Sequence, residues 1–145
     1  MKAVDHFTVE ERDLIKRAVH KAEDLTSGEV RVFIEDKCKT DVLDRAAFVF
    51  AELLMHKTEE RNGVLIYLAL SDKKFAIIGD AGIHSKVGVD FWNSIKERMA
   101  EHFKQARFTE GLVQGITEAG NALQQYFPHS DNDSNELSDD IVFGK

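Results

Sequence analysis

An uninterrupted apolar run, Val64 to Leu70, is the feature that most constrains how this chain can fold. Such a run without polar alternation is typical of a central strand that is covered on both faces. The polar turn 71–74 leads into a second apolar segment at 75–79, so the two segments predict an antiparallel hairpin. The glycine-bearing stretch 80–88 follows the hairpin, and we expect it to be a loop.

The segments around this hairpin show helical or strand periodicity. Helices are expected at 8–26, 41–56, 89–104 and 109–127, and a strand is expected at 29–35. Thr8 and Glu11 have capping-box spacing at the start of the first helix. The stripes expected to face the core include Leu14 and Leu25 in the first helix and Leu43 and Leu54 in the second. Glycines in the last helix suggest a close approach to the sheet.

This order of elements predicts an α/β fold, a three-layer αβα sandwich with a small mixed sheet of roughly three or four strands flanked by about four helices. The strand at 29–35 and the first hairpin strand are joined through a helix and should run parallel. We expect one domain over residues 1–128 and a flexible acidic tail over 129–145. A short edge strand at 140–143 is an option within that tail.

Charge and composition limit the function classes. The chain has 145 residues, with 26 acidic against 19 basic residues and a net charge of -7, which argues against nucleic acid and favours a cationic partner. Cys38 is the only cysteine and cannot form an internal disulfide. No signal peptide or membrane span is evident, so we expect a soluble, cytoplasmic monomer, or an envelope protein if a leader has been removed.

Four ordered sequence blocks resemble the TPM domain family, named after the thylakoid lumen phosphatase, photosystem II repair and acetylcholine-receptor modulator proteins. The blocks are Thr26-Ser-Gly-Glu-Val30, Asn62-Gly-Val-Leu-Ile-Tyr-Leu-Ala-Leu70, Ile78-Gly-Asp-Ala-Gly-Ile83 and Phe108-Thr-Glu-Gly-Leu112. The chain looks most like the bacterial branch of the family. The resemblance implies an αβα fold, divalent cation binding with calcium favoured, and weak acid phosphatase activity.

The predicted topology also indicates where a cation could bind. If the second hairpin strand is antiparallel, Asp80 at its end lies beside the start of the 29–35 strand and the loop before Asn62. Hard cations take carboxylate and carbonyl oxygens. The candidate metal ligands are therefore Asp80, then Glu29, Glu60 and Asp90. Calcium is the favoured ion, with magnesium as an alternative and zinc as another, for which His84 could serve as a ligand.

Each candidate also has a purely structural explanation. Asp90 could cap the third expected helix, Glu29 could pair with Arg61, and Asp80 could close its own turn. No catalytic motif is present, and no catalytic residue is assigned. Three hypotheses therefore stay open: a cation-binding regulatory or interaction module, a metal-assisted acid phosphatase, and a protein-interaction domain that uses the sheet edge or the tail without an ion.

Overall fold

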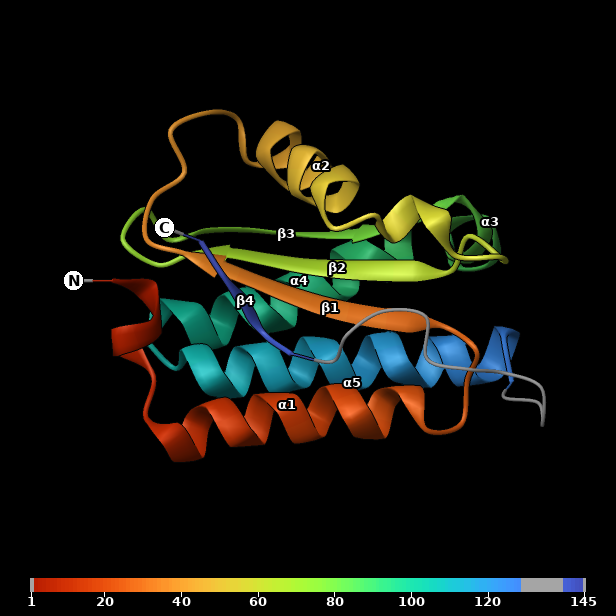
Figure 1. Cartoon of the computed structure of the whole chain (residues 1–145), viewed down its shortest axis with the longest axis horizontal. Coiled ribbons are helices and arrows are strands. Elements are labelled where there is room, and N and C mark those ends of the chain that lie inside the picture. Colours follow the sequence, from red (N-terminus) through yellow and green to blue (C-terminus); the bar gives the residue numbers. More distant parts are fainter. Residues whose placement is uncertain (1, 129–139, 145) are drawn as a thin grey trace.

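The computed structural model of this chain describes residues 2–128 and 140–144. In these residues a mixed sheet of four strands lies between two helical layers, which confirms the expected α/β fold (Figure 1). The strands follow the order β3-β2-β1-β4 across the sheet. Their bounds are β1 (Glu29–Glu35), β2 (Gly63–Ala69), β3 (Lys74–Gly79) and β4 (Val142–Phe143).

The strand register confirms the predicted topology. β1 runs parallel to β2, with Glu29 opposite Gly63. β2 runs antiparallel to β3, with Val64 opposite Gly79. Every residue of β2 is buried, as expected for a central strand that is covered on both faces.

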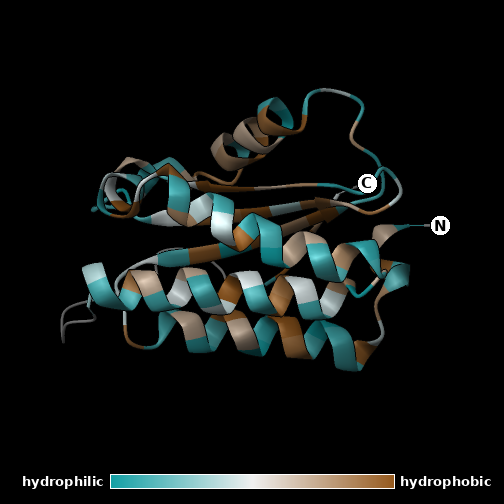
Figure 2. Cartoon of the chain, turned by 180° about the vertical axis from the view of Figure 1, so that it is seen from behind, coloured by the Kyte–Doolittle hydropathy of each residue, from teal (hydrophilic) through white to brown (hydrophobic). Residues whose placement is uncertain are grey.

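The two helical layers are unequal. Helices α1 (Val9–Glu23), α4 (Val89–Lys104) and α5 (Phe108–Tyr126) cover one face, whereas α2 (Val42–Glu52) covers the other (Figure 1). The short helix α3 (Ala81–Val87) lies at one end of the sheet. Viewed from behind, the strands are largely hydrophobic, while the helices alternate between hydrophobic and hydrophilic segments, as amphipathic helices do (Figure 2).

Helix α1 begins at the predicted capping box. Thr8 Oγ1 accepts a hydrogen bond from the Glu11 amide at 3.0 Å, and Glu11 Oε1 accepts one from the Thr8 amide at 2.9 Å. The predicted core stripe was too wide, because Leu14 is exposed and Leu25 lies beyond the helix end, also exposed. α1 packs chiefly against the single neighbour α5, so only a narrow stripe that includes Ile15 is buried.

Helix α2 begins at the predicted cap but ends earlier than expected. The side chain of Asp41 accepts hydrogen bonds from two amides of the first turn. After Glu52 the chain passes through Leu54, whose φ is 58°, into the short 3-10 helix η2 (Met55–Lys57). The expectation that Leu43 and Leu54 face the core was wrong, since both are exposed. Among the described residues, only the short helix η2 accompanies α2 on this face of the sheet, and Leu43 and Leu54 stay exposed.

The stretch after β3 is a helix, which corrects the expectation of a loop over 80–88. Asp80 is the N-cap of α3, and its side chain accepts a hydrogen bond from the Ala81 amide at 2.7 Å. Gly82 permits this arrangement. A Cβ at that position would lie 2.1 Å from the carbonyl oxygen of Glu60 and 2.6 Å from that of Arg61. The glycine therefore lets α3 pack directly on the loop that precedes β2.

The glycines of α5 bring helices together and not, as expected, the helix and the sheet. Built Cβ atoms at two of them would meet α4 side chains: Gly111 would meet Phe103 at 2.4 Å and Gly115 would meet Met99 at 2.5 Å. A Cβ at Gly120 would meet Ala22 of α1 at 2.6 Å. The glycines thus set the spacing of the helical layer.

The C-terminal segment supplies the optional edge strand. β4 pairs in parallel with β1, with Val142 opposite Phe33 and Phe143 opposite Ile34. Figure 1 shows β4 along the outer edge of β1, close to the C-terminus. The predicted flexible tail falls mostly on 129–139, which lies outside the described residues.

Candidate functional site

The predicted cation ligands lie mainly at one end of the sheet. Asp80 donates its amide to the carbonyl of Gly63 at 2.9 Å, and Glu29 donates its amide to the carbonyl of Asn62 at 3.4 Å. The starts of β1 and β2 and the end of β3 therefore meet, as the topology predicted. We call this end of the sheet the acidic rim and define it by Glu29, Glu60, Arg61, Asn62 and Asp80.

Asp80 is the carboxylate of the acidic rim that pairs with Arg61. It is 7% exposed, and its two oxygens accept hydrogen bonds from Arg61, from Nε at 2.6 Å and from Nη2 at 2.7 Å. This bidentate hydrogen bonding raises the pKa of the Arg61 guanidinium. Arg61 reaches Asp80 from a left-handed backbone conformation, with a φ of 53°. A cation that bound Asp80 would have to displace Arg61.

A second group of polar side chains surrounds Asn62. Ser27 Oγ donates a hydrogen bond to Glu60 Oε2 at 2.6 Å. Asn62 Nδ2 lies 3.2 Å from Ser27 Oγ and 3.4 Å from Glu60 Oε2. The side chain of Asn62 is 1% exposed, and its Oδ1 atom has no hydrogen-bond partner among the described residues. A carboxylate, a hydroxyl and the amide nitrogen of Asn62 thus gather at this point, and the amide oxygen of Asn62 stays unpaired among the described residues.

The other two candidates differ in position. Glu29 is buried at the start of β1, 2% exposed, opposite Gly63. Asp90 is exposed in the first turn of α4, where its charge complements the helix dipole. Within residues 2–128 and 140–144, no group of three or more His, Cys, Asp or Glu side chains lies close enough to hold a metal ion. His84 uses Nδ1 to accept a hydrogen bond from Trp92 Nε1 at 3.0 Å.

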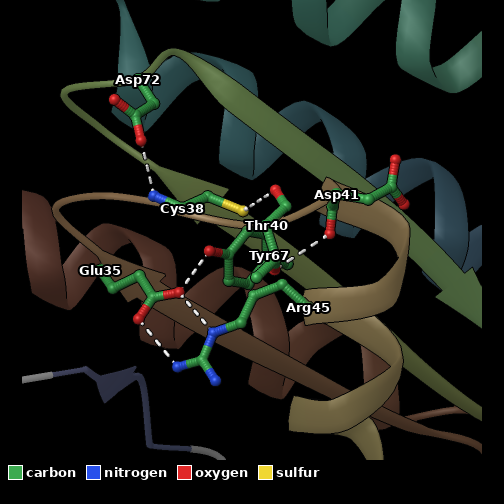
Figure 3. A network of polar contacts seen from close by, with 7 residues as sticks. All are labelled: Glu35, Cys38, Thr40, Asp41, Arg45, Tyr67 and Asp72. Carbon is green, nitrogen blue, oxygen red and sulfur yellow. Dashed lines mark hydrogen bonds and ion pairs between the residues drawn. The ribbon is translucent and has the colours of Figure 1, made fainter.

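Sequence reasoning missed a polar network on the α2 face of the sheet, shown in Figure 3. Glu35 is 6% exposed and accepts hydrogen bonds from Arg45 Nε at 2.8 Å, from Arg45 Nη2 at 2.9 Å and from the Tyr67 hydroxyl. We call these three residues the Glu35 network. The signal available in the sequence was a glutamate at the end of a predicted strand, and the structure buries every residue of that strand except Arg31, which is partly buried.

Charge balance holds the Glu35 network together. Burial works to raise the pKa of Glu35, but the hydrogen bonds from Arg45 and Tyr67 lower it below its ordinary value. Hydrogen bonding to Glu35 raises the pKa of Arg45, and burial raises that of Tyr67. Cys38 lies beside them, with its amide bound to Asp72 Oδ2 at 2.7 Å and its thiol to the Thr40 carbonyl at 3.3 Å (Figure 3). The network joins α2 to the sheet.

Comparison with known proteins finds one matching family model and solved structures with the same fold. A family model described as the TPM domain matches residues 2–122. The NMR structure of the BA42 protein from the psychrophilic bacterium Bizionia argentinensis is 46% identical, with 94% of each chain covered and a TM-score of 0.87. No curated protein matches this chain.

A more distant likeness shows the fold alone. The solution NMR structure of the N-terminal domain of a protein from P. gingivalis is 17% identical to this chain, with 86% of this chain and 82% of that chain covered and a TM-score of 0.69. None of the helices in the part of the chain that the structure describes is long and apolar enough to cross a membrane.

Proposed function

This chain belongs to the TPM domain family, and we propose that its acidic rim binds a divalent cation, calcium favoured, and that the bound ion regulates contact with a partner protein. Asn62 carries the proposal, because its buried Oδ1 atom has no hydrogen-bond partner among the described residues. A buried acceptor without a partner costs free energy, which a bound cation would offset.

The oxygen atoms near Asn62 suit a hard cation. Glu60 would supply a carboxylate, the buried Oδ1 of Asn62 would supply an amide oxygen once the amide group turns toward the ion, and water would complete the coordination shell. Glu29 adds a further carboxyl group at this end of the sheet. Calcium is favoured over magnesium because it accepts six to eight oxygens in flexible geometry, whereas magnesium demands a near-ideal octahedron.

Arg61 would act as a built-in competitor of the ion. Its side chain is 51% exposed, whereas that of Asp80 is 6% exposed, so Arg61 can turn into solvent while Asp80 stays in place. An ion that binds near Glu60 would repel the guanidinium and leave Asp80 free to join the coordination shell. Loss of this ion pair would let the loop before β2 move, and α3 packs on that loop. Ion binding would in this way change the surface that α3 and the loop present to a partner.

A calcium titration of the isotopically labelled full chain, followed by amide NMR, tests the proposal. We expect the amide signals of residues 60–62 and 80–84 to shift at concentrations up to the millimolar range. Glu60→Gln should weaken binding by about tenfold or more, because it removes a ligand charge. Arg61→Gln should tighten binding, because Asp80 then has no competing cation.

Asp90→Asn is the matched control, since Asp90 lies in α4 and not among the rim residues that the proposal uses. It should leave calcium affinity unchanged. The proposal fails if the rim amides do not move, or if Asp90→Asn lowers affinity as much as Glu60→Gln does.

Arg61 also favours a second candidate, a metal-assisted phosphatase. A guanidinium released from Asp80 would lie at the rim, where it could bind a phosphoryl oxygen next to the ion. Hydrolysis of p-nitrophenyl phosphate by the wild type, Arg61→Gln and Asp80→Ala separates the two candidates. The phosphatase requires both substitutions to abolish calcium-dependent turnover, whereas the regulatory module requires no turnover.

A further inference from the structure

The outer edge of β1 is covered by the chain's own C-terminal segment, residues 140–144. Val142 and Phe143 pair in parallel with Phe33 and Ile34, and the Gly144 amide donates to the Ile34 carbonyl at 2.8 Å. This backbone pairing is the kind by which an extended peptide is added to a sheet edge. The segment therefore occupies a peptide-sized site on the folded domain.

This segment packs against the edge of the apolar clusters but is not enclosed by them. Residues 141–144 are only partly buried, and they lie outside the set of fully buried residues that forms the core. The ion pair between Lys16 Nζ and Asp140 Oδ1, at 3.1 Å, has both side chains largely exposed. A strand of two partly buried residues detaches more easily than the fully buried central strand does.

The surface beneath the segment selects its sequence. Phe143 meets the ring of Phe7 with centroids 6.2 Å apart, and α1 forms a groove beside Ile141. A Cβ at Gly144 would lie 2.8 Å from Glu35 Cβ and 3.0 Å from Phe33 Cζ. Position 144 must therefore be glycine, because Glu35 is held in place by Arg45 and Tyr67 and cannot make room for a side chain.

We propose that the edge of β1 is a binding site for an extended segment of a partner protein, with an acidic residue, then apolar residues, an aromatic residue and a glycine. Residues 140–144 occupy this site in cis and must leave before the partner binds. The eleven residues 129–139 connect the segment to the domain. Because the segment and the site belong to one chain, the segment is present at an effective concentration on the order of millimolar, and the site is closed to weak competitors. The site is separate from the acidic rim and requires no ion.

The test uses the full chain, in buffer with EDTA, and a fluorescent peptide that matches residues 138–145. Gly144→Val in the chain should expel its own strand and open the edge. We expect this variant to bind the peptide about tenfold or more tightly than the wild type does, because the competing segment of the same chain no longer occupies the site. A peptide that carries the same Gly144→Val change should bind at least about tenfold more weakly, because its side chain would collide with Glu35.

A second variant, Val142→Pro, places in β4 a residue that cannot donate a backbone hydrogen bond to a neighbouring strand. This variant should also release β4 and increase peptide binding. Amide NMR of both variants should show dispersed signals of a folded domain and peptide-induced shifts at Phe33 and Ile34. The proposal is overturned if the folded variants bind no peptide, if the shifts lie elsewhere, or if both peptides bind equally. It is also overturned if light scattering finds a wild-type dimer that exchanges β4 between copies, since the occupant is then a second copy.

Discussion

Glu35 is one of the carboxylates that this fold keeps almost fully out of water. A buried charge costs several kcal/mol unless it is paired and hydrogen-bonded. Arg45 from α2 and Tyr67 from β2 meet that requirement, since both donate to the same carboxylate. The pair also positions the Glu35 side chain against Gly144, so one residue supports both a helix and the strand edge.

Replacing Glu35 by glutamine should lower stability in a pH-dependent way. The pKa of Glu35 in the folded chain lies below its ordinary value of 4.5, so its charge stabilises the fold above that pH. This contribution is lost as the pH falls through the folded pKa. We expect Glu35→Gln to cost about 2 kcal/mol near neutral pH and progressively less under acid conditions.

Urea unfolding of wild type and variant across acid and neutral pH measures this difference. Glu59→Gln, at an exposed position before the rim, is the control and should change stability by less than about 0.5 kcal/mol. A Glu35→Gln deficit that stays constant from neutral pH into acid would contradict the role assigned to the carboxylate.

At the scale of elements, the glycines of α5 lie at its contacts with two different helices, α4 and α1. A Cβ at Gly120 would lie 2.6 Å from Ala22 Cβ and 2.9 Å from Ala22 Cα, so it meets the body of α1. A Cβ at Gly115 would lie 2.5 Å from the sulfur of Met99, which is the far part of a flexible side chain. The two positions look alike in the sequence and differ only in what they touch.

Gly120→Ala should therefore destabilise the chain by about 2 kcal/mol, because α1 must move to make room. Gly115→Ala should be nearly neutral, because Met99 can change rotamer and alanine improves helix propensity by about 1 kcal/mol. Urea unfolding of the two variants gives the comparison directly. Equal losses for both would mean that the helix spacing does not depend on the neighbour's backbone.

The elements that the sequence predicted well are those whose pattern reports burial directly. The run at β2 and the periodicity of α4 need no knowledge of neighbours, and both elements formed as expected. α3 was missed because its helix depends on Asp80 as a cap and on Gly82 fitting against the Glu60 carbonyl. Leu14 was misplaced because periodicity shows which residues share a face but not how wide a neighbour covers it.

At the scale of the whole molecule, the sequence predicted which strand ends meet at the acidic rim but not how the side chains there pair. Parallel β1 and β2 with antiparallel β3 bring Glu29 and Asp80 to one end of the sheet, which follows from topology alone. The pairing of Asp80 with Arg61 depends on a left-handed residue that no pattern indicates. The Glu35 network joins residues from different layers, and its partners become visible only once α2 is placed on the sheet.

The two layers should also differ in stability. One face of the sheet is covered by α1, α4 and α5 around a large apolar cluster, whereas α2 and the short helix η2 cover the smaller cluster around Tyr67. Local opening costs less where fewer buried contacts are broken. We expect native-state hydrogen exchange to show α2 amides exchanging about tenfold or more faster than those of β2, with α5 as the protected control. If the amides of α2 and β2 exchange at one common rate, α2 opens only when the whole domain unfolds. The Glu35 network would then hold α2 more tightly than the contact area of α2 implies.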